Sequence, residues 1–266
     1  MDIDLVTLSK QGGRDYNEDV YGHWHNGHYV ACLVADGAGG HGGGDVAAAT
    51  ARASILNGFA AGPTLDATTI QQLLEQANLA VVARQAEGGK LASMRSTIVL
   101  AAVDLEQQAL LWAHSGDSRA YLFRGGSIVA RTTDHSLVQQ MVASGMLDDE
   151  SARMHPQRNM LLSALGSVNE PPEIAVSDRM RLQPGDVLLL CSDGVWEPLG
   201  DEVLVDSLHA SRTAAQWADE IDLLVQSHAK PGHDNYTALV LWVRQDDDDT
   251  TRLMGADELL PATSAP

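Results

Sequence analysis

Four aspartates stand beside short apolar runs, where a folded sheet could bring their carboxylates together. Asp36 follows the run 29–34 and Asp193 follows the run 186–191, whereas Asp19 and Asp234 each precede one. Any one of them alone is typical of a turn. If all four met, the like charges would repel, and they could not all stay ionised without cations. Ligands that are all oxygen select Mg²⁺ or Mn²⁺ over Zn²⁺, so the pattern indicates a site for divalent metal ions.

Two such ions would give the cluster a specific chemistry. Divalent cations about 4 Å apart can hold a bridging water as hydroxide and orient an in-line displacement at phosphorus. Arg14, the only cation in the polar stretch 14–19, suits bidentate recognition of phosphate oxygens. The chain carries no Ser nucleophile elbow, Cys nucleophile signature or Walker A sequence. The residues therefore predict a two-metal phosphoester hydrolase.

The glycines after Asp36 allow an alternative. Gly37, Gly39 and Gly42 fit the dinucleotide fingerprint, which needs a strand, a tight turn and a helix in that order. A second parallel strand should then follow the helix, but the chain continues with Pro63 and a second helical pattern. Asp36 would also face a pyrophosphate with no cation between them. We therefore favour metal ligation over dinucleotide binding.

The elements that must position these residues follow from periodicity. Helices are predicted over 45–59, over 68–87 with a capping box at Thr69 and Gln72, and after Thr213 with Gln216. Strand patterns cover 97–103, 109–114, 119–123 and 128–132, and their short connections predict an antiparallel meander. Strand runs and helical runs are segregated, which favours an α+β fold with antiparallel sheets covered by helices.

Domain limits come from where the pattern stops. No linker interrupts residues 1–244, which we expect to form one domain. Within it, Ser136 and Gln139 open a short helix, and the following stretch to residue 160 is polar, Met-rich and without a clean period. Residues 245–266 are acidic and lack periodicity, so we expect a disordered tail.

Composition narrows the classes of partner. The 266 residues hold 36 acidic side chains against 17 Lys and Arg, a net charge of −19. This balance argues against nucleic acid and against anionic membranes, because both need clustered basic residues. The first residues lack the apolar stretch of a signal peptide, and no apolar run reaches the length of a membrane span. With reduced, buried Cys32 and Cys191, we expect a cytoplasmic monomer.

Several short motifs occur along the chain in the same order as in a known family, which the sequence therefore resembles. The metal-dependent (type 2C) Ser/Thr protein phosphatases share this order over about residues 5–243, and the Gly-Gly-His variant is similar to their compact bacterial branch. The motifs are Arg14-x-x-Asn17-Glu18-Asp19, Val34-Ala35-Asp36-Gly37-x-Gly39-Gly40-His41, Ser96-Thr97, Gly116-Asp117-Ser118-Arg119, Asp134-His135, Leu165-Gly166, Ser192-Asp193-Gly194 and Asp234-Asn235-x-Thr237.

The resemblance implies a fold and a set of metal ligands. The fold would be a four-layer αββα sandwich of two antiparallel sheets flanked by helices, with two Mn²⁺ or Mg²⁺ ions at its edge and residues 137–160 as a variable flap. By that likeness Asp36 bridges both ions and the Gly37 carbonyl ligates one, while further carboxylates complete the site. These are Asp193 and Asp234 on the other ion, Glu18 and Asp19 through metal-bound waters, and Asp117 on a weaker third ion.

The resemblance also implies an activity: hydrolysis of phosphoserine and phosphothreonine in proteins by a metal-bridging water, opposing a bacterial Ser/Thr kinase. Two positions depart from the family pattern. Ala38 stands where many eukaryotic members have a His that is a proposed general acid, and Arg95 stands where the family usually has Gly. The alternative is a pseudophosphatase that only binds phosphoproteins, but the intact carboxylates favour an enzyme. A two-metal nuclease is disfavoured by the net charge.

Overall fold

The protein is a sandwich of two antiparallel sheets, described in a computed structural model over residues 1–39 and 42–244. The predicted acidic tail lies outside the described residues. The five-stranded sheet has the order β1 (Ile3–Lys10), β12 (Tyr236–Val243), β11 (Val187–Cys191), β7 (Arg119–Arg124) and β8 (Ser127–Arg131). The seven-stranded sheet has the order β10 (Met180–Arg181), β6 (Ala109–Ser115), β5 (Ile98–Asp104), β3 (Tyr29–Ala38) and β2 (Asp19–His25), with β4 (Arg95–Ser96) on β3 and β9 (Ala175–Val176) on β6.

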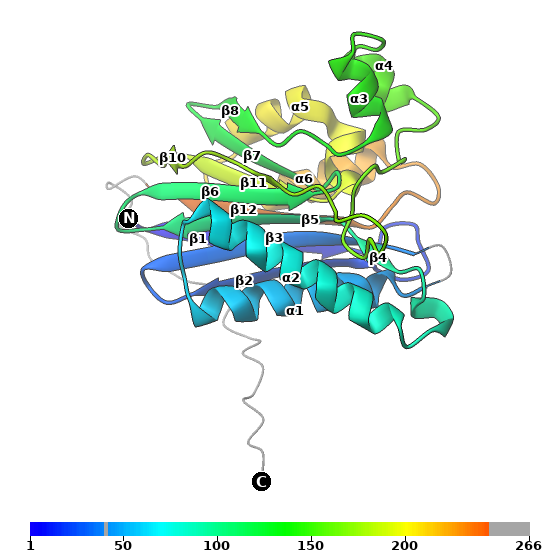
Figure 1. The fold of residues 1–266 in the computed structure, drawn as a ribbon. Coiled ribbons are helices and arrows are strands. Elements are labelled where there is room, and N and C mark those ends of the chain that lie inside the picture. The colour runs from blue at the N-terminus through cyan, green and yellow to red at the C-terminus, as the bar shows by residue number, and fades with distance from the viewer. Residues whose placement is uncertain (40–41, 245–266) are drawn as a thin grey trace.

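Two helix pairs cover the outer faces and complete four layers (Figure 1). Helices α1 (Gly44–Ala61) and α2 (Ala67–Gln85) pack on the seven-stranded sheet, and α5 (Asp193–Ala210) and α6 (Ala214–His228) pack on the five-stranded one. The short elements are η1 (Gly89–Leu91), α3 (Leu137–Ala143) and α4 (Asp149–Met154). The predicted αββα sandwich is confirmed. None of the helices in the described ranges is long and apolar enough to cross a membrane.

The apolar core has three layers, because each sheet is buried on both faces. Val34, Val99, Leu190 and Leu239 lie between the sheets, whereas two further clusters lie under the helix pairs. Every residue of β5 is buried. This double burial explains why the strands appear in the sequence as continuous apolar runs rather than as alternating ones.

The predicted four-strand meander is wrong at the connection between its second and third strands. Strands β5 and β6 pair, and so do β7 and β8, but β6 and β7 belong to different sheets. The chain changes sheet at Gly116, whose φ of +106° favours glycine and where a Cβ would lie 2.7 Å from the Thr97 side chain. Short connections could not reveal this, because a tight turn can join two sheets as well as two neighbouring strands. The crossing places Asp117 at the end of the sandwich.

Two helix predictions also need correction. The cap of α2 is Asp66, which accepts a hydrogen bond from the Thr69 backbone N–H at 2.8 Å, so Thr69 is inside the helix rather than at its cap. Helix α5 was not predicted at all, because Pro198 and the non-helical Gly200 interrupt its pattern. The caps at Ser136 and Thr213 are confirmed, since each accepts a hydrogen bond from the backbone N–H three residues later.

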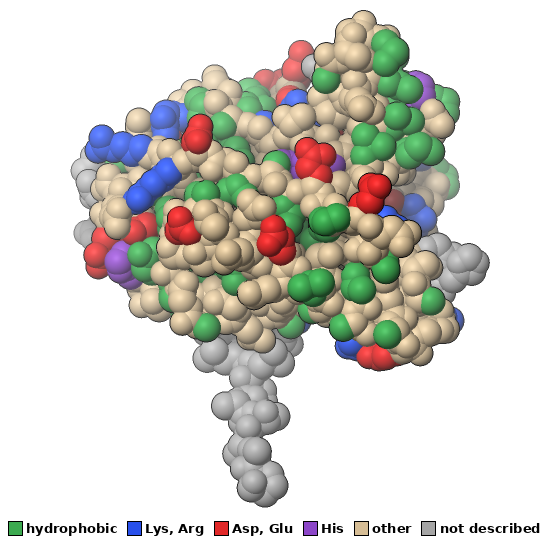
Figure 2. Space-filling view, in the orientation of Figure 1, with side chains coloured by type: hydrophobic (Ala, Val, Ile, Leu, Met, Phe, Trp, Pro, Cys, Tyr) green, Lys and Arg blue, Asp and Glu red, His purple; other side chains and the backbone are tan. Residues whose placement is uncertain are grey.

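The segment 137–160 extends above one end of the sandwich in Figure 1 as α3, α4 and their connections. Figure 2 shows hydrophobic side chains gathered over this part of the surface, where Met146 and Met154 are exposed. An ion pair between Arg158 and Glu197 ties the segment to the N-terminal part of α5, four residues after Asp193. The segment therefore stands beside the start of that helix, next to Asp193.

Candidate metal centre

Asp19 and Asp36 face each other across the β2–β3 ladder, where they are direct register partners. Side chains opposed in this way are close neighbours on one face of a sheet. The Ser192 hydroxyl donates a hydrogen bond of 2.6 Å to Asp19 Oδ2. The other carboxylate oxygen, Asp19 Oδ1, is buried and has no hydrogen-bond partner. The seven-stranded sheet thus supplies two carboxylates to the site: the half-buried Asp36, and the buried Asp19 with its unsatisfied oxygen.

The five-stranded sheet supplies Asp193 and Asp234 from two neighbouring strands. Asp193 is the first residue of α5, directly after β11, and Asp234 stands just before β12. Because β11 and β12 pair antiparallel, the end of one lies beside the start of the other. Gly194 permits this approach, since a Cβ there would lie 2.0 Å from the Asn235 carbonyl oxygen. Asp193 Oδ1 is also buried without a partner.

The electrostatics show that these carboxylates form one cluster. Burial, followed by repulsion from Asp193, Asp19, Asp117 and Asp234, raises the pKa of Asp36 well above its ordinary value. Burial likewise raises the pKa of Asp193, and Asp117 and Asp234 add to the effect. Burial raises the pKa of Asp19 to about 6 and that of Asp117 to about 7. Protons or bound cations must therefore neutralise part of the negative charge of this cluster.

The donor set fits hard divalent cations. It consists of oxygen atoms, and two of them, Asp19 Oδ1 and Asp193 Oδ1, are buried acceptors whose lack of a partner costs stability. Over residues 1–39 and 42–244, no three acidic, His or Cys side chains are close enough together to hold a metal ion by themselves. Such a set suits an ion that is bound partly through its own waters, as Mg²⁺ is.

Gly37 and Glu18 shape the wall next to Asp36. A Cβ on Gly37 would lie 2.2 Å from the backbone of Gly44, so only glycine lets the end of β3 approach the start of α1 this closely. Glu18 Oε1 accepts a hydrogen bond of 3.1 Å from the Gly44 backbone N–H, and the Glu18 carbonyl accepts one of 3.2 Å from Gly37. Burial raises the pKa of Glu18.

Arg14 lies at the rim and contacts the cluster directly. Its Nη2 donates to Asp234 Oδ2 at 2.7 Å, and both side chains are partly exposed. Asn235 holds the Arg14 loop, because its Nδ2 donates to the Gln11 carbonyl at 2.7 Å and to the Tyr16 carbonyl at 3.0 Å. The structure thus brings Arg14 to the carboxylates, where it pairs with one of them.

Behind Asp117 lies a buried charge network that the sequence did not indicate as a unit. The Trp196 indole N–H donates to the Asp117 carbonyl at 2.9 Å. The Arg119 guanidinium lies 3.5 Å over the Trp196 ring and donates to both oxygens of Asp134, at 2.8 and 2.7 Å. Trp196 follows the Asp193-Gly194 motif by two residues, but only the unpredicted helix α5 turns its ring toward Asp117.

With this geometry established, the relatives of the chain identify its family. Residues 9–240 match the model of the family described as Protein phosphatase 2C. The chain belongs to this family. The predicted resemblance is confirmed, and it extends over both sheets and all four covering helices.

Known phosphatases are similar to this chain in sequence and in structure over most of its length. The serine/threonine phosphatase stp of Listeria monocytogenes is 32% identical over 234 residues, covering 86% of this chain and 90% of that protein. The solved Mycobacterium tuberculosis phosphatase PstP/Ppp superposes with a TM-score of 0.78 at 29% identity, covering 91% of this chain and 99% of that one. A structure of the PstP catalytic domain in complex with two manganese ions has a TM-score of 0.75 at 28% identity, with the same coverage.

These comparisons confirm the prediction of a metal-dependent Ser/Thr protein phosphatase acting on phosphoproteins, and they do not support the pseudophosphatase alternative.

Proposed function

We propose that the chain hydrolyses phosphoserine and phosphothreonine in proteins at the carboxylate cluster, with two Mn²⁺ or Mg²⁺ ions. The observation that carries this proposal is the placement of Asp36 opposite Asp19 in the β2–β3 ladder and near Asp193, where desolvation and repulsion raise the pKa of its carboxyl. Burying so many acidic groups costs stability unless cations neutralise them. When bound, the two ions would supply an activated water and offset the charge of the phosphate.

The residues around the cluster suit defined roles as ligands. Asp36 lies at the centre of the carboxylate interactions and would bridge the two ions, with the Gly37 carbonyl beside it on one of them. Asp193 and Asp234 come from the opposite sheet and would hold the other ion. Glu18 and Asp19 would bind through water, and Asp117, across the sheet crossing, would bind a weaker third ion.

Arg14 would bind the phosphate of the substrate. In the structure its guanidinium is paired with Asp234, which is itself a proposed ligand. A cation on Asp234 competes for the same carboxylate, so its binding would free the planar guanidinium for bidentate contact with phosphate oxygens. Arg95 is exposed, is the register partner of Ala38, and forms no ion pair with the residues that the structure describes. It would extend the positive side of the substrate site.

The substrates would be phosphoproteins made by a Ser/Thr kinase, and we propose a cytoplasmic monomer that opposes such a kinase. Segment 137–160 would act as the flap beside the cleft, since Arg158 ties it to α5 next to Asp193. The proposed domain covers residues 1–244.

The experiment is hydrolysis of a phosphothreonine peptide with and without Mn²⁺. We expect turnover with the metal, none after chelation, and the largest loss for Asp36→Asn. Asp206→Asn removes an exposed carboxylate from the far part of α5 and is the matched control. Calorimetric titration with Mn²⁺ provides a readout independent of activity, and Asp36→Asn should weaken binding. Activity that survives chelation contradicts the metal site, and binding of phosphopeptide without turnover restores the pseudophosphatase alternative.

A further inference from the structure

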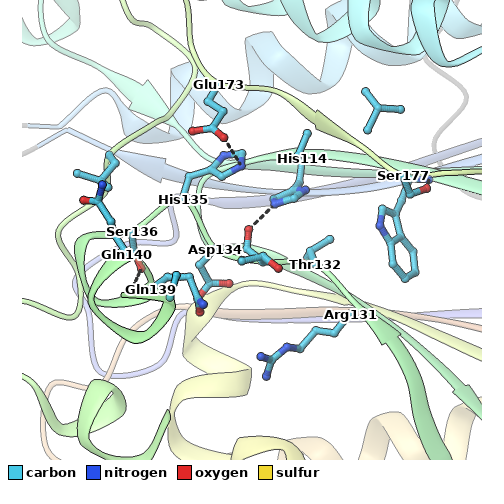
Figure 3. Close-up of a pocket in the computed structure, with 16 residues that line it drawn as sticks. His114, Arg131, Thr132, Asp134, His135, Ser136, Gln139, Gln140, Glu173 and Ser177 are labelled. Carbon is cyan, nitrogen blue, oxygen red and sulfur yellow. Dashed lines mark hydrogen bonds and ion pairs between the residues drawn. The ribbon is translucent and has the colours of Figure 1, made fainter. Parts of the chain in front are cut away.

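A cavity that opens to solvent lies beside the metal centre and is separate from it. Its volume is about 450 Å³, and it lies between β6, β9, α3 and the loop 132–136 (Figure 3). None of the proposed metal ligands lines it. The cavity nevertheless shares a wall with the cluster, because the His135 backbone N–H donates to the Gly116 carbonyl at 2.9 Å, and Gly116 directly precedes Asp117. The wall of the cavity is therefore joined by a backbone hydrogen bond to the turn that carries Asp117.

One acidic side chain on the cavity lining has no Lys or Arg partner among the described residues. Asp134 is paired with Arg119, and Arg131 is paired with Asp201 at 2.6 Å. Glu173, by contrast, has an exposed side chain and lies 3.8 Å from His135 Nε2. Figure 3 shows it at the rim, next to the His135 ring.

His135 does not supply the missing positive charge. The Gly116 backbone N–H points at its Nδ1, at 3.4 Å, so that nitrogen carries no proton. Burial lowers the pKa of the imidazole, although Glu173 and Asp134 pull it the other way. Among the described residues, Glu173 thus forms no ion pair with Lys or Arg.

The floor of the cavity holds a second unmatched acceptor. His114 is 4% exposed and stacks on His135 with ring centroids 4.6 Å apart. Its Nε2 must donate to the Thr133 carbonyl at 2.8 Å, since a carbonyl oxygen only accepts. Nδ1 is therefore the unprotonated nitrogen, and it is buried with no hydrogen-bond partner. This nitrogen has no accessible surface, whereas the Glu173 carboxylate is exposed, so of the two acceptors only Glu173 can contact a donor brought by a ligand.

The remaining walls suit a long aliphatic stem. Trp112, Leu162, Ala143 and Val176 provide apolar surface along the cavity. Lysine and arginine side chains bury such a stem while their charged end contacts a carboxylate or an aromatic face. An anionic or purely apolar group would leave Glu173 unmatched, and the net charge of −19 favours a basic partner over an acidic one.

We propose that this cavity binds a lysine or arginine side chain of the phosphoprotein substrate, close in sequence to the phosphorylated residue. The proposal rests on the proposed function, because it places the phosphorylated residue at the carboxylate cluster. Glu173 pairs with the basic end of the side chain, and the apolar walls hold its stem. The cavity thus selects phosphoproteins that carry a basic residue next to the phosphorylation site.

The test compares phosphothreonine peptides that differ only by Arg or Ala at one position, scanned over three residues on either side. With Mn²⁺ present, kcat/KM should be about 3- to 5-fold higher for Arg at one or two positions, the upper range for an exposed charge pair. Glu173→Gln should reduce that ratio below about 2, and Glu173→Lys should reverse it. Glu170→Gln, which removes an exposed charge outside the cavity three residues away, should keep the preference.

The outcomes separate this inference from the proposed function. If neither peptide is hydrolysed, the proposed function fails. If both are hydrolysed with equal kcat/KM, or if Glu173→Gln and Glu170→Gln lower the ratio equally, the basic subsite is wrong. Arginine amide is the remaining probe: competitive inhibition that is lost in Glu173→Gln supports the subsite, whereas binding that does not affect turnover of the Arg peptide shows a separate ligand site and overturns it.

Discussion

Asp19→Asn is expected to stabilise the metal-free protein at alkaline pH. Burial raises the pKa of the Asp19 carboxyl from 3.8 to about 6, so the folded protein binds the proton more tightly than the unfolded chain does. Stability from this group is complete below pH 3.8 and is lost as the pH rises through about 6. At 1.36 kcal/mol per pKa unit, the loss amounts to about 3 kcal/mol at pH 8. We expect the measured loss to lie between about 1 and 3 kcal/mol.

The substitution suits the site because it removes the charge and keeps the contact. An asparagine oxygen can still accept the hydrogen bond that Ser192 donates to Asp19 at 2.6 Å. In the chelated protein, Asn should therefore raise the free energy of unfolding at pH 8 and change it little below pH 4. With Mn²⁺ the order should reverse at pH 8, because the wild-type carboxylate gains a cation and the variant loses a ligand.

Urea denaturation at pH 4, 6 and 8, with chelator and with Mn²⁺, measures these free energies. Asp206→Asn is the control, since its carboxylate is exposed on α5. Chelated wild-type protein that is as stable at pH 8 as at pH 6, relative to this control, would contradict the raised pKa of Asp19. Destabilisation by Asp19→Asn at pH 8 would contradict it as well.

Four further predictions concern the same domain. Arg119→Met leaves buried Asp134 unpaired and should lower the free energy of unfolding by about 3–5 kcal/mol. The control Arg84→Met, at an exposed ion pair, should lower it by less than about 1 kcal/mol. Equal losses in urea denaturation would contradict a stabilising buried network. Arg14→Ala should mainly raise KM, with a loss of about 2–3 kcal/mol in kcat/KM, and unchanged kinetics would make it an ordinary surface residue. Asp117→Ala should lower kcat while calorimetry still detects the two tighter ions, and loss of all metal would place Asp117 among their ligands. A chain ending at Arg244 should keep its melting temperature and activity, and a marked drop in either would show that the tail contributes.

Local sequence signals predict some elements of this fold and miss others. The pairing of β2 with β3 could be predicted, because the Asn26-Gly27 turn and the flanking apolar runs are local signals. Helix α5 could not, since Pro198 and Gly200 oppose a helix locally and only packing on the five-stranded sheet stabilises it. The cavity containing Glu173 was also missed, because its walls come from strands, a loop and a helix with no common motif.

By itself, the sequence determined the chemistry of this protein: which carboxylates stand at strand ends, which glycine adjoins Asp36, and the ordered motifs that indicate the phosphatase family. These are properties of residue type and short-range spacing. Only the tertiary structure decided that β6 and β7 lie in different sheets, which carries Asp117 to the cluster, and that Arg14 pairs with Asp234 across 220 positions. The reason is physical, because burial and repulsion between carboxylates depend on distances in space that local sequence patterns do not encode.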